Sequence, residues 1–342
     1  MSLRPIAVLS TGLVTAAGLS APATAAAIRA GVGNPTETRF VDSAGKRLMA
    51  HQVTLEHPWR GRSKLVQMAS LAIVECLADI PRDDWSNIPL LLCVAERDRP
   101  GRVAGLDDEL FVELQSALGV QFAAQSLIIP QGRASAWLAM MHARRMLGEG
   151  SAPHVLVAAT DSLINRPALA APERAGRLLT STNSNGFIAG EGSGALLFGA
   201  ADAELRLTCA GLGFGTEPAT VSSEEPLRAD GLARAITEAL REAEREIQDL
   251  HFRITDLSGE QYYFKEAALA LARLLRVRKD EFDLWHPAQC VGELGSVAGV
   301  TMLVVAEAAC RKGYAPGPDV LCHCACDAGQ RAAAVMRFGA AQ

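Results

Sequence analysis

The chain has 342 residues, of which 49% are apolar, 21% are charged and 5% are aromatic. This composition excludes a disordered chain, a collagen and a small disulfide scaffold, and it allows one large domain or two of ordinary size. The net charge of −5 provides no basic surface for nucleic acid or for an anionic membrane, so we expect neither as a partner.

The N-terminal region does not match a targeting segment. Its apolar run from Ile6 to Ala30 is interrupted by Gly12, Gly18 and Pro22, whereas a secretory signal or a membrane-spanning helix needs an unbroken apolar stretch. The eight cysteines are spread along the chain, mostly inside apolar runs. This distribution is typical of reduced, buried thiols, and we therefore expect a cytoplasmic protein without disulfides.

Strands and helices alternate along the first half of the chain. Short continuous apolar runs predict strands that are covered on both faces, and apolar residues at helical spacing predict the helices between them. The expected strands are 5–10, 90–94, 127–129 and 154–159, and the expected helices are 21–30, 63–77, 107–118 and 135–147. We also expect a weak hairpin within 36–57 and a glycine-rich turn between two strand-like runs within 186–198.

The second half repeats this order of elements. Its expected strands are 205–211, 253–257, 319–324 and 332–338, and its expected helices are 232–247, 264–275 and one that opens from the turn at 292–299 and ends near 311. The repeated order predicts two fused, similar halves rather than two unrelated domains. We place their boundary between residues 202 and 203, which gives an N-terminal half of 1–202 and a C-terminal half of 203–342.

Three glycine-rich segments support a more specific interpretation. They are STGLVTAAG at 10–18, NGFIAGEGSGALLF at 185–198 and GELGSVAG at 292–299. The first resembles the TGxGxVTPxG segment of β-ketoacyl synthases, the second their DGFVxGEGAGxLVL segment and the third their GHLxGAAG segment. All three occur in the order and spacing of that family, so nearly the whole chain resembles the β-ketoacyl synthase branch of the thiolase-like proteins.

The resemblance implies an α/β fold of the thiolase-like type, with five layers in the order αβαβα and two pseudo-symmetric halves. It also implies a dimer in which the short strand at 127–129 pairs across the twofold axis. Family members are usually somewhat longer. The missing length falls between Gly31 and Arg60 and in loops before the second strand, regions that shape the substrate entrance and the dimer surface of ketosynthases.

The resemblance further locates the four catalytic positions of a ketosynthase. Family enzymes use a cysteine at a helix N-terminus, where the dipole lowers the pKa of the thiol, together with two histidines and a lysine. The matching positions in this sequence are Arg133, Ser258, Glu293 and Ala288. An arginine stays protonated in proteins and cannot act as a nucleophile. The loss of all four residue types argues against condensing activity, and we expect no catalytic residues of the family type.

Arg133 and Glu293 both fall in the region of the family's active site, where a buried guanidinium requires a partner. We hypothesise a salt bridge between them that fills the pocket, and the alternative is that both are solvated in a widened cleft. The family's gating loop matches HCACDAG at 323–329, which lacks the gating phenylalanine. Trp137, one helical turn after Arg133, is a candidate plug for the acyl tunnel.

We expect no metal and no cofactor. Three cysteines and a histidine lie close together at 322–326, but zinc sites usually have a second, distant ligand pair, and the sequence offers none. His286 is a candidate general base and Cys290 a candidate displaced nucleophile. A histidine in a loop more often has no catalytic role, and nothing in the sequence places Cys290 at a helix N-terminus beside a base. For both residues a non-catalytic role is therefore the favoured interpretation.

These observations favour a non-catalytic ketosynthase homologue that acts as a structural, adaptor or partner subunit. It would resemble a chain length factor or form a homodimeric scaffold, with a homodimer, an active ketosynthase or an acyl carrier protein as the expected partner. An alternative is an acyltransferase or decarboxylase with altered residues, using Ser258, His286 or Cys290. A third alternative is an acyl-carrier or anion-binding module in which Arg133 holds the anion. An open pocket with a nucleophile in contact with a base would favour the enzyme.

Overall fold

The computed structural model describes residues 5–340 of the chain, and its main strands form two groups of five. The N-terminal group has the spatial order β1-β7-β6-β4-β5 and comprises β1 (Ile6–Thr15), β4 (Leu90–Val94), β5 (Leu127–Pro130), β6 (His154–Ser162) and β7 (Ala189–Ala200). The C-terminal group has the spatial order β8-β12-β11-β9-β10 and comprises β8 (Arg206–Thr216), β9 (Phe252–Thr255), β10 (Leu284–Trp285), β11 (Asp319–Ala325) and β12 (Gln330–Gly339).

The two groups have the same connectivity. In each, the first three strands are joined by antiparallel pairs and the last three by parallel pairs. The groups meet where β1 and β8 pair over three residues each. This repetition supports the proposed boundary at 202/203, which lies in the link between β7 and β8 and stays a prediction.

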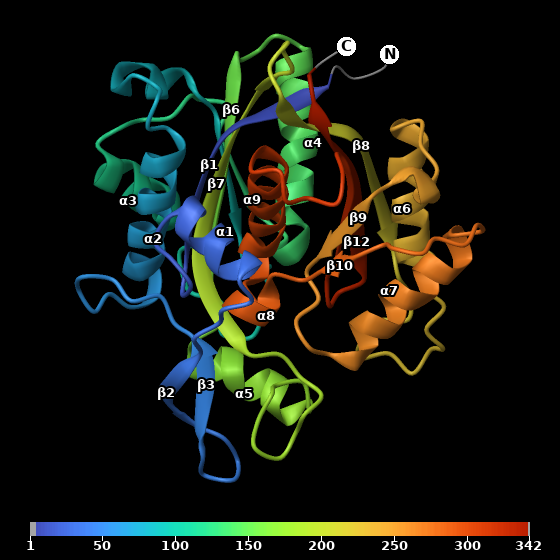
Figure 1. The fold of residues 1–342 in the computed structure, drawn as a ribbon. Coiled ribbons are helices and arrows are strands. Elements are labelled where there is room, and N and C mark those ends of the chain that lie inside the picture. The colour runs from blue at the N-terminus through green and yellow to red at the C-terminus, as the bar shows by residue number, and fades with distance from the viewer. Residues whose placement is uncertain (1–4, 341–342) are drawn as a thin grey trace.

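Helices cover both groups of strands and also fill the space between them (Figure 1). Helices α2 (Gly61–Cys76) and α3 (Glu109–Leu118) lie outside the N-terminal strands, and α6 (Asp230–Glu242) and α7 (Gln261–Leu274) lie outside the C-terminal strands. Between them lie α4 (Ser135–Gly148) and α9 (Ala298–Arg311). The remaining helices are α1 (Ala21–Arg29), α5 (Arg166–Arg174) and α8 (Ala288–Val291). The order of layers is therefore helix, strand, helix, strand, helix.

The glycine-rich segments that predict turns are largely inside strands. The chain stays extended through Gly12 in β1 and through Gly211, Gly213 and Gly215 in β8. An added Cβ at Gly12 would lie 2.0 Å from the Ala72 carbonyl oxygen of α2, and one at Gly211 would lie 2.0 Å from the Ala239 carbonyl oxygen of α6. The glycines therefore allow each outer helix to pack directly against a strand, and the predicted strand ends at 10 and 211 are wrong for this reason.

Three other elements differ in how well the sequence predicts them. The weak hairpin is confirmed as β2 (Thr36–Val41) and β3 (Arg47–His51). Helix α5 was not expected, because its sequence RPALAAPER has few apolar residues at helical spacing. The second-half helix expected at 232–247 ends at Glu242, and Ile247 belongs to a separate short 3-10 turn.

The two central helices approach each other at a glycine. An added Cβ at Gly299 of α9 would lie 2.7 Å from the Ala136 Cβ of α4, and Trp137 lies beside the same position. Trp137 is fully buried in the largest apolar cluster of the molecule. Across residues 5–340, none of the helices combines the length and the apolar character needed to cross a membrane.

Candidate functional site

The N-termini of the two central helices converge at the centre of the molecule. A short 3-10 turn at Gly132–Ala134 precedes α4, and a second one at Gly295–Val297 precedes α9. Gly132 and Gly295 begin these turns with φ values of 52° and 55°, in the left-handed region that favours glycine. Arg133 lies within the first of these turns, and Glu293 lies two residues before the second.

Arg133 is surrounded by carboxylates. Its guanidinium lies 3.6 Å from a carboxylate oxygen of Glu293 and 3.7 Å from one of Asp256, and it forms its closest ion pair with Asp327. It also donates a hydrogen bond of 3.2 Å to the Tyr263 hydroxyl and lies 4.8 Å from the centre of that ring. The side chain of Arg133 is only 11% exposed, so these groups replace its water of hydration.

A second arginine is connected to the first through Asp327. Arg177 donates to both oxygens of Asp327, at 2.6 and 3.1 Å, and also to both oxygens of Glu260. Tyr263 donates its hydroxyl to Asp327 at 2.5 Å. Asp327 belongs to the C-terminal segment 323–329 that matches the family's gating loop, while both arginines belong to the N-terminal half. The ion pairs therefore hold this loop against the N-terminal half.

Burial and the arginines act in opposite directions on the pKa values of these acids. Burial raises the pKa of Asp256 to about 7, although Arg133 and a hydrogen bond from the Ala325 amide partly oppose the rise. Burial likewise raises the pKa of Glu260, against the effect of Arg177. At Asp327 burial is outweighed by Arg133 and Arg177, and the pKa is held well below its usual range. The pKa of Arg133 is raised because the acidic groups around it outweigh its burial.

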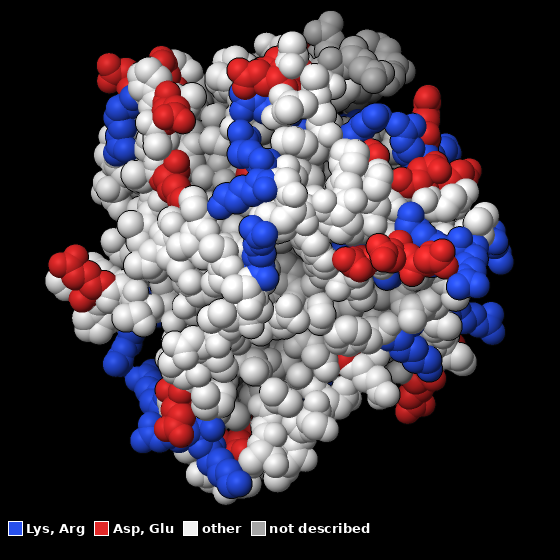
Figure 2. All heavy atoms as spheres, viewed as in Figure 1, with Lys and Arg blue, Asp and Glu red and all other residues white. Residues whose placement is uncertain are grey.

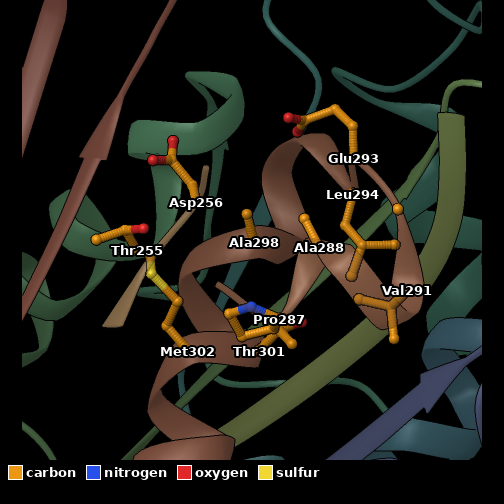
Figure 3. A pocket seen from close by; sticks show the side chains of 11 residues that line it. Thr255, Asp256, Pro287, Ala288, Val291, Glu293, Leu294, Ala298, Thr301 and Met302 are labelled. Carbon is orange, nitrogen blue, oxygen red and sulfur yellow. The ribbon is translucent and has the colours of Figure 1, made fainter. Parts of the chain in front are cut away.

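Little space remains beside these charges. The cavity next to Asp256 and Glu293 has a volume of about 10 Å³, close to the minimum that a single water molecule requires. Figure 3 shows the carboxyl groups of Asp256 and Glu293 at one end of this cavity, with Pro287, Leu294 and Met302 around the remainder. The cavity is too small for an acyl chain.

The structure brings together three of the four predicted site positions. The hypothesised ion pair between Arg133 and Glu293 is present at 3.6 Å, although Glu293 is not the closest partner of Arg133. Ala288 lines the same small cavity as Glu293. Ser258 is not among the residues that line this cavity, whereas Asp256, two residues earlier, lines it and lies 3.7 Å from the Arg133 guanidinium. The match of Ser258 to the family's first histidine position stays a prediction.

The candidate residues of an altered enzyme lack the hydrogen bonds that would activate them: the Ser258 Oγ and the His286 Nδ1 each have no partner. The Ser258 hydroxyl has no hydrogen-bond partner, so it is not activated by His286. His286 instead packs its ring edge-to-face on Phe264, 5.7 Å between centroids. Burial raises the pKa of the Cys290 thiol, which disfavours the reactive thiolate. Among residues 5–340 no group of His, Cys, Asp or Glu side chains is arranged to hold a metal ion.

Sequence reasoning missed most partners of Arg133. Asp327 is the one charged residue in the segment 323–329, which also lacks the phenylalanine of the family's loop. These two features together are a signal in the sequence that the contacts of this segment differ from those of the family. Asp256 lies at the end of a predicted strand, two residues from the position that was considered. Tyr263, Arg177 and Glu260 lie between motifs, and nothing in their local sequence indicates that they meet.

Comparison with known proteins finds relatives through structure alone. No model of a known protein family and no curated protein sequence matches the chain. Among solved structures, the ishigamide ketosynthase/chain length factor matches with a TM-score of 0.78 and 16% identity over 99% of this chain and 100% of that one. The ketosynthase ApeO in complex with its chain length factor ApeC from Xenorhabdus doucetiae matches with a TM-score of 0.77 and 14% identity over 98% of each chain.

A third match is the complex of AntDE with AntF, a type II polyketide synthase carrier protein bound to its ketosynthase, with a TM-score of 0.79 and 16% identity over 98% of this chain and 99% of that one. These likenesses span nearly the whole chain and agree with the order of layers and the convergence of the two central helices. This protein therefore has the thiolase-like fold of ketosynthases and chain length factors.

Proposed function

We propose that this protein is a non-catalytic partner subunit with a ketosynthase fold. The observation that carries the proposal is the state of Arg133. It stands at the N-terminus of the central helix α4, where a ketosynthase would place its nucleophilic cysteine, and it is held by three carboxylates. An arginine cannot accept an acyl group at this position, because it does not lose its proton in proteins.

The surroundings of Arg133 support the same conclusion. The adjacent cavity of about 10 Å³ leaves no room for an acyl chain, and Asp327 ties the segment after β11 to Arg133 and Arg177. A network of ion pairs in place of the catalytic groups keeps the centre of the fold packed but provides no nucleophile for condensation. Two of the solved structures described above contain a chain length factor, which is the kind of subunit that we propose here.

The edge of the N-terminal group of strands is the expected partner surface. Strand β5 is the last in its group and has no further strand beside it among residues 5–340. Its sequence LIIP is apolar, and Leu127 is 42% exposed. An exposed apolar edge strand is a template for pairing with another chain. We propose that it pairs with a second copy of this protein or with an active ketosynthase, and that the resulting dimer contacts an acyl carrier protein.

Light scattering coupled to size exclusion tests the partner surface. The protein is expected to show the mass of a dimer, both alone and mixed with a candidate ketosynthase. The Leu127→Lys variant is expected to show the mass of a monomer. Val112→Lys is the matched control, since Val112 is also apolar and is 64% exposed on α3, away from β5. A monomeric mass for the wild type with every ketosynthase tried, or equal behaviour of the two variants, would refute the proposed surface.

An assay for malonyl decarboxylation and acyl condensation tests the absence of chemistry. We expect no turnover from the protein alone and no covalent acyl adduct by mass spectrometry, with an active ketosynthase as the positive control. An acyl adduct on Ser258 or Cys290 would instead establish the altered enzyme. The two experiments are independent, so the dimer and the loss of activity stand or fail separately.

A further inference from the structure

A second cavity lies on the other side of Pro287 from the closed site. It has a volume of about 390 Å³ and is formed by α1, β10, α9 and the segment after α9. Its apolar surfaces include the rings of Trp285 and Tyr314, which lie 6.3 Å apart between centroids with 21° between their planes. Pro287 lines both this cavity and the closed one. The volume falls within the range of small-molecule sites.

A neighbouring cavity of about 350 Å³ continues this one towards the surface. The two share Arg29 and Tyr314, and Lys312 lines the outer one. The Arg29 guanidinium lies over the Tyr314 ring, 4.3 Å from its centre. Figure 2 shows Lys and Arg side chains in a column over the region where Figure 1 shows α1 and α9. In a chain of net charge −5, the mouth of this cavity is therefore locally cationic.

The charges at the mouth have no acidic partner in the cavity. Among residues 5–340 no Asp or Glu lines either cavity, and neither Arg29 nor Lys312 forms a salt bridge. The nearby Glu307 is already paired with Arg311.

We propose that these joined cavities bind a small planar anion, with a flat ring against Trp285 and Tyr314 and a phosphate or carboxylate at Arg29 and Lys312. The aromatic surfaces favour a ring, and the two cations favour an anionic group at the mouth. The site lies outside the region that carries the proposed partner function, and it neither requires that function nor is excluded by it.

Calorimetric titration of the whole protein with four probes tests this site. Adenosine monophosphate and 1-naphthoate each combine a ring with an anion, whereas adenosine has only the ring and inorganic phosphate only the anion. We expect the first two to bind and the last two to bind at least about tenfold more weakly, a factor that corresponds to about 1.4 kcal/mol.

Two variants locate the binding. Arg29→Gln is expected to weaken both complete probes about tenfold, and Gln289→Trp, at an exposed lining position, is expected to obstruct the cavity. The matched control is Arg174→Gln, since Arg174 is likewise an exposed arginine in the last turn of a nine-residue helix. No binding of either complete probe at millimolar concentration, equal binding of adenosine, or equal effects of Arg29→Gln and Arg174→Gln would overturn the proposal.

Discussion

The guanidinium of Arg133 lies 3.6 Å from the carboxylate of Glu293, one just before helix α4 and the other just before helix α9. The pair therefore joins the segments that precede the two central helices. Because Asp256 and Asp327 also belong to the C-terminal half, all three carboxylates that form ion pairs with Arg133 come from the half that does not contain it. Arg133 therefore joins the two halves of the chain at the centre of the molecule.

Replacement of Arg133 by Met is the first test of this arrangement. We expect Arg133→Met to lower the free energy of unfolding by about 3–5 kcal/mol, because removing one partner leaves buried carboxylates without a cation. The measurement is urea unfolding followed by circular dichroism. The triple variant Arg133→Met, Asp256→Asn, Glu293→Gln is expected to recover part of the loss, since no buried charge then remains unpaired there. A single variant within about 1 kcal/mol of wild type would contradict the role of the network.

Asp327 provides the second test, because it connects the loop after β11 to two arginines. Its side chain is 45% exposed, so solvent screens these ion pairs, and we expect Asp327→Asn to cost about 1–3 kcal/mol of unfolding free energy. The same variant should increase hydrogen exchange of the amides at 326–329. Asp280→Asn is the control, since it removes an ion pair with Arg278 on the surface. An equal effect of the two variants would show that Asp327 does not hold the loop.

The overall fold was predictable because its signals are repeated along the chain. Continuous apolar runs marked the buried strands, and β4 has the bounds that its sequence predicts. Glycine was misinterpreted where it lies inside a strand. At Gly12 and Gly211 a larger side chain would collide with the backbone of a helix that packs on the strand. Each of these helices is distant in the sequence, so the residues around the glycine do not indicate the contact.

The site was only partly predictable for a related reason. Arg133 and Glu293 were found because they replace residues within recognisable motifs, and their ion pair followed from the cost of burying a guanidinium. Arg177 and Glu260 have no such signal, since each is an ordinary charged residue until the fold brings them together. Ser258 stays a prediction at the family's first histidine position, and nothing in the sequence around Asp256 indicates that it lies beside Arg133.

Asp256 gives the network a dependence on pH. Its pKa is raised from 3.8 to about 7. Between about pH 4 and pH 7 the folded protein therefore retains a proton that the unfolded chain has already released. The contribution of Asp256 to stability is therefore present at low pH and is lost as pH rises through about 7. Asp256→Asn has no proton to lose, and we expect its melting temperature, relative to wild type, to rise from pH 5 to about pH 7 and to level off above that.

The control for this pH profile is Asp79→Asn, an exposed residue without an ion pair among residues 5–340. Its melting temperature relative to wild type is expected to stay constant over the same range. Buffers of matched ionic strength keep screening of the surface pairs constant. A flat profile for Asp256→Asn, or a falling one, would show that Asp256 is ionised throughout and that Arg133 outweighs its burial.

The contact between the central helices gives a final test, which is independent of charge. Because an added Cβ at Gly299 would lie 2.7 Å from the Ala136 Cβ, Gly299→Val is expected to force α4 and α9 apart and to cost about 1–3 kcal/mol. Gly339→Val is the matched control, since the same Cβ meets no atom within 4 Å there. Adding Ala136→Gly should restore part of the loss, because it removes the nearest atom. Equal unfolding midpoints in urea for Gly299→Val and Gly339→Val would mean that the central helices are not closely packed at this point.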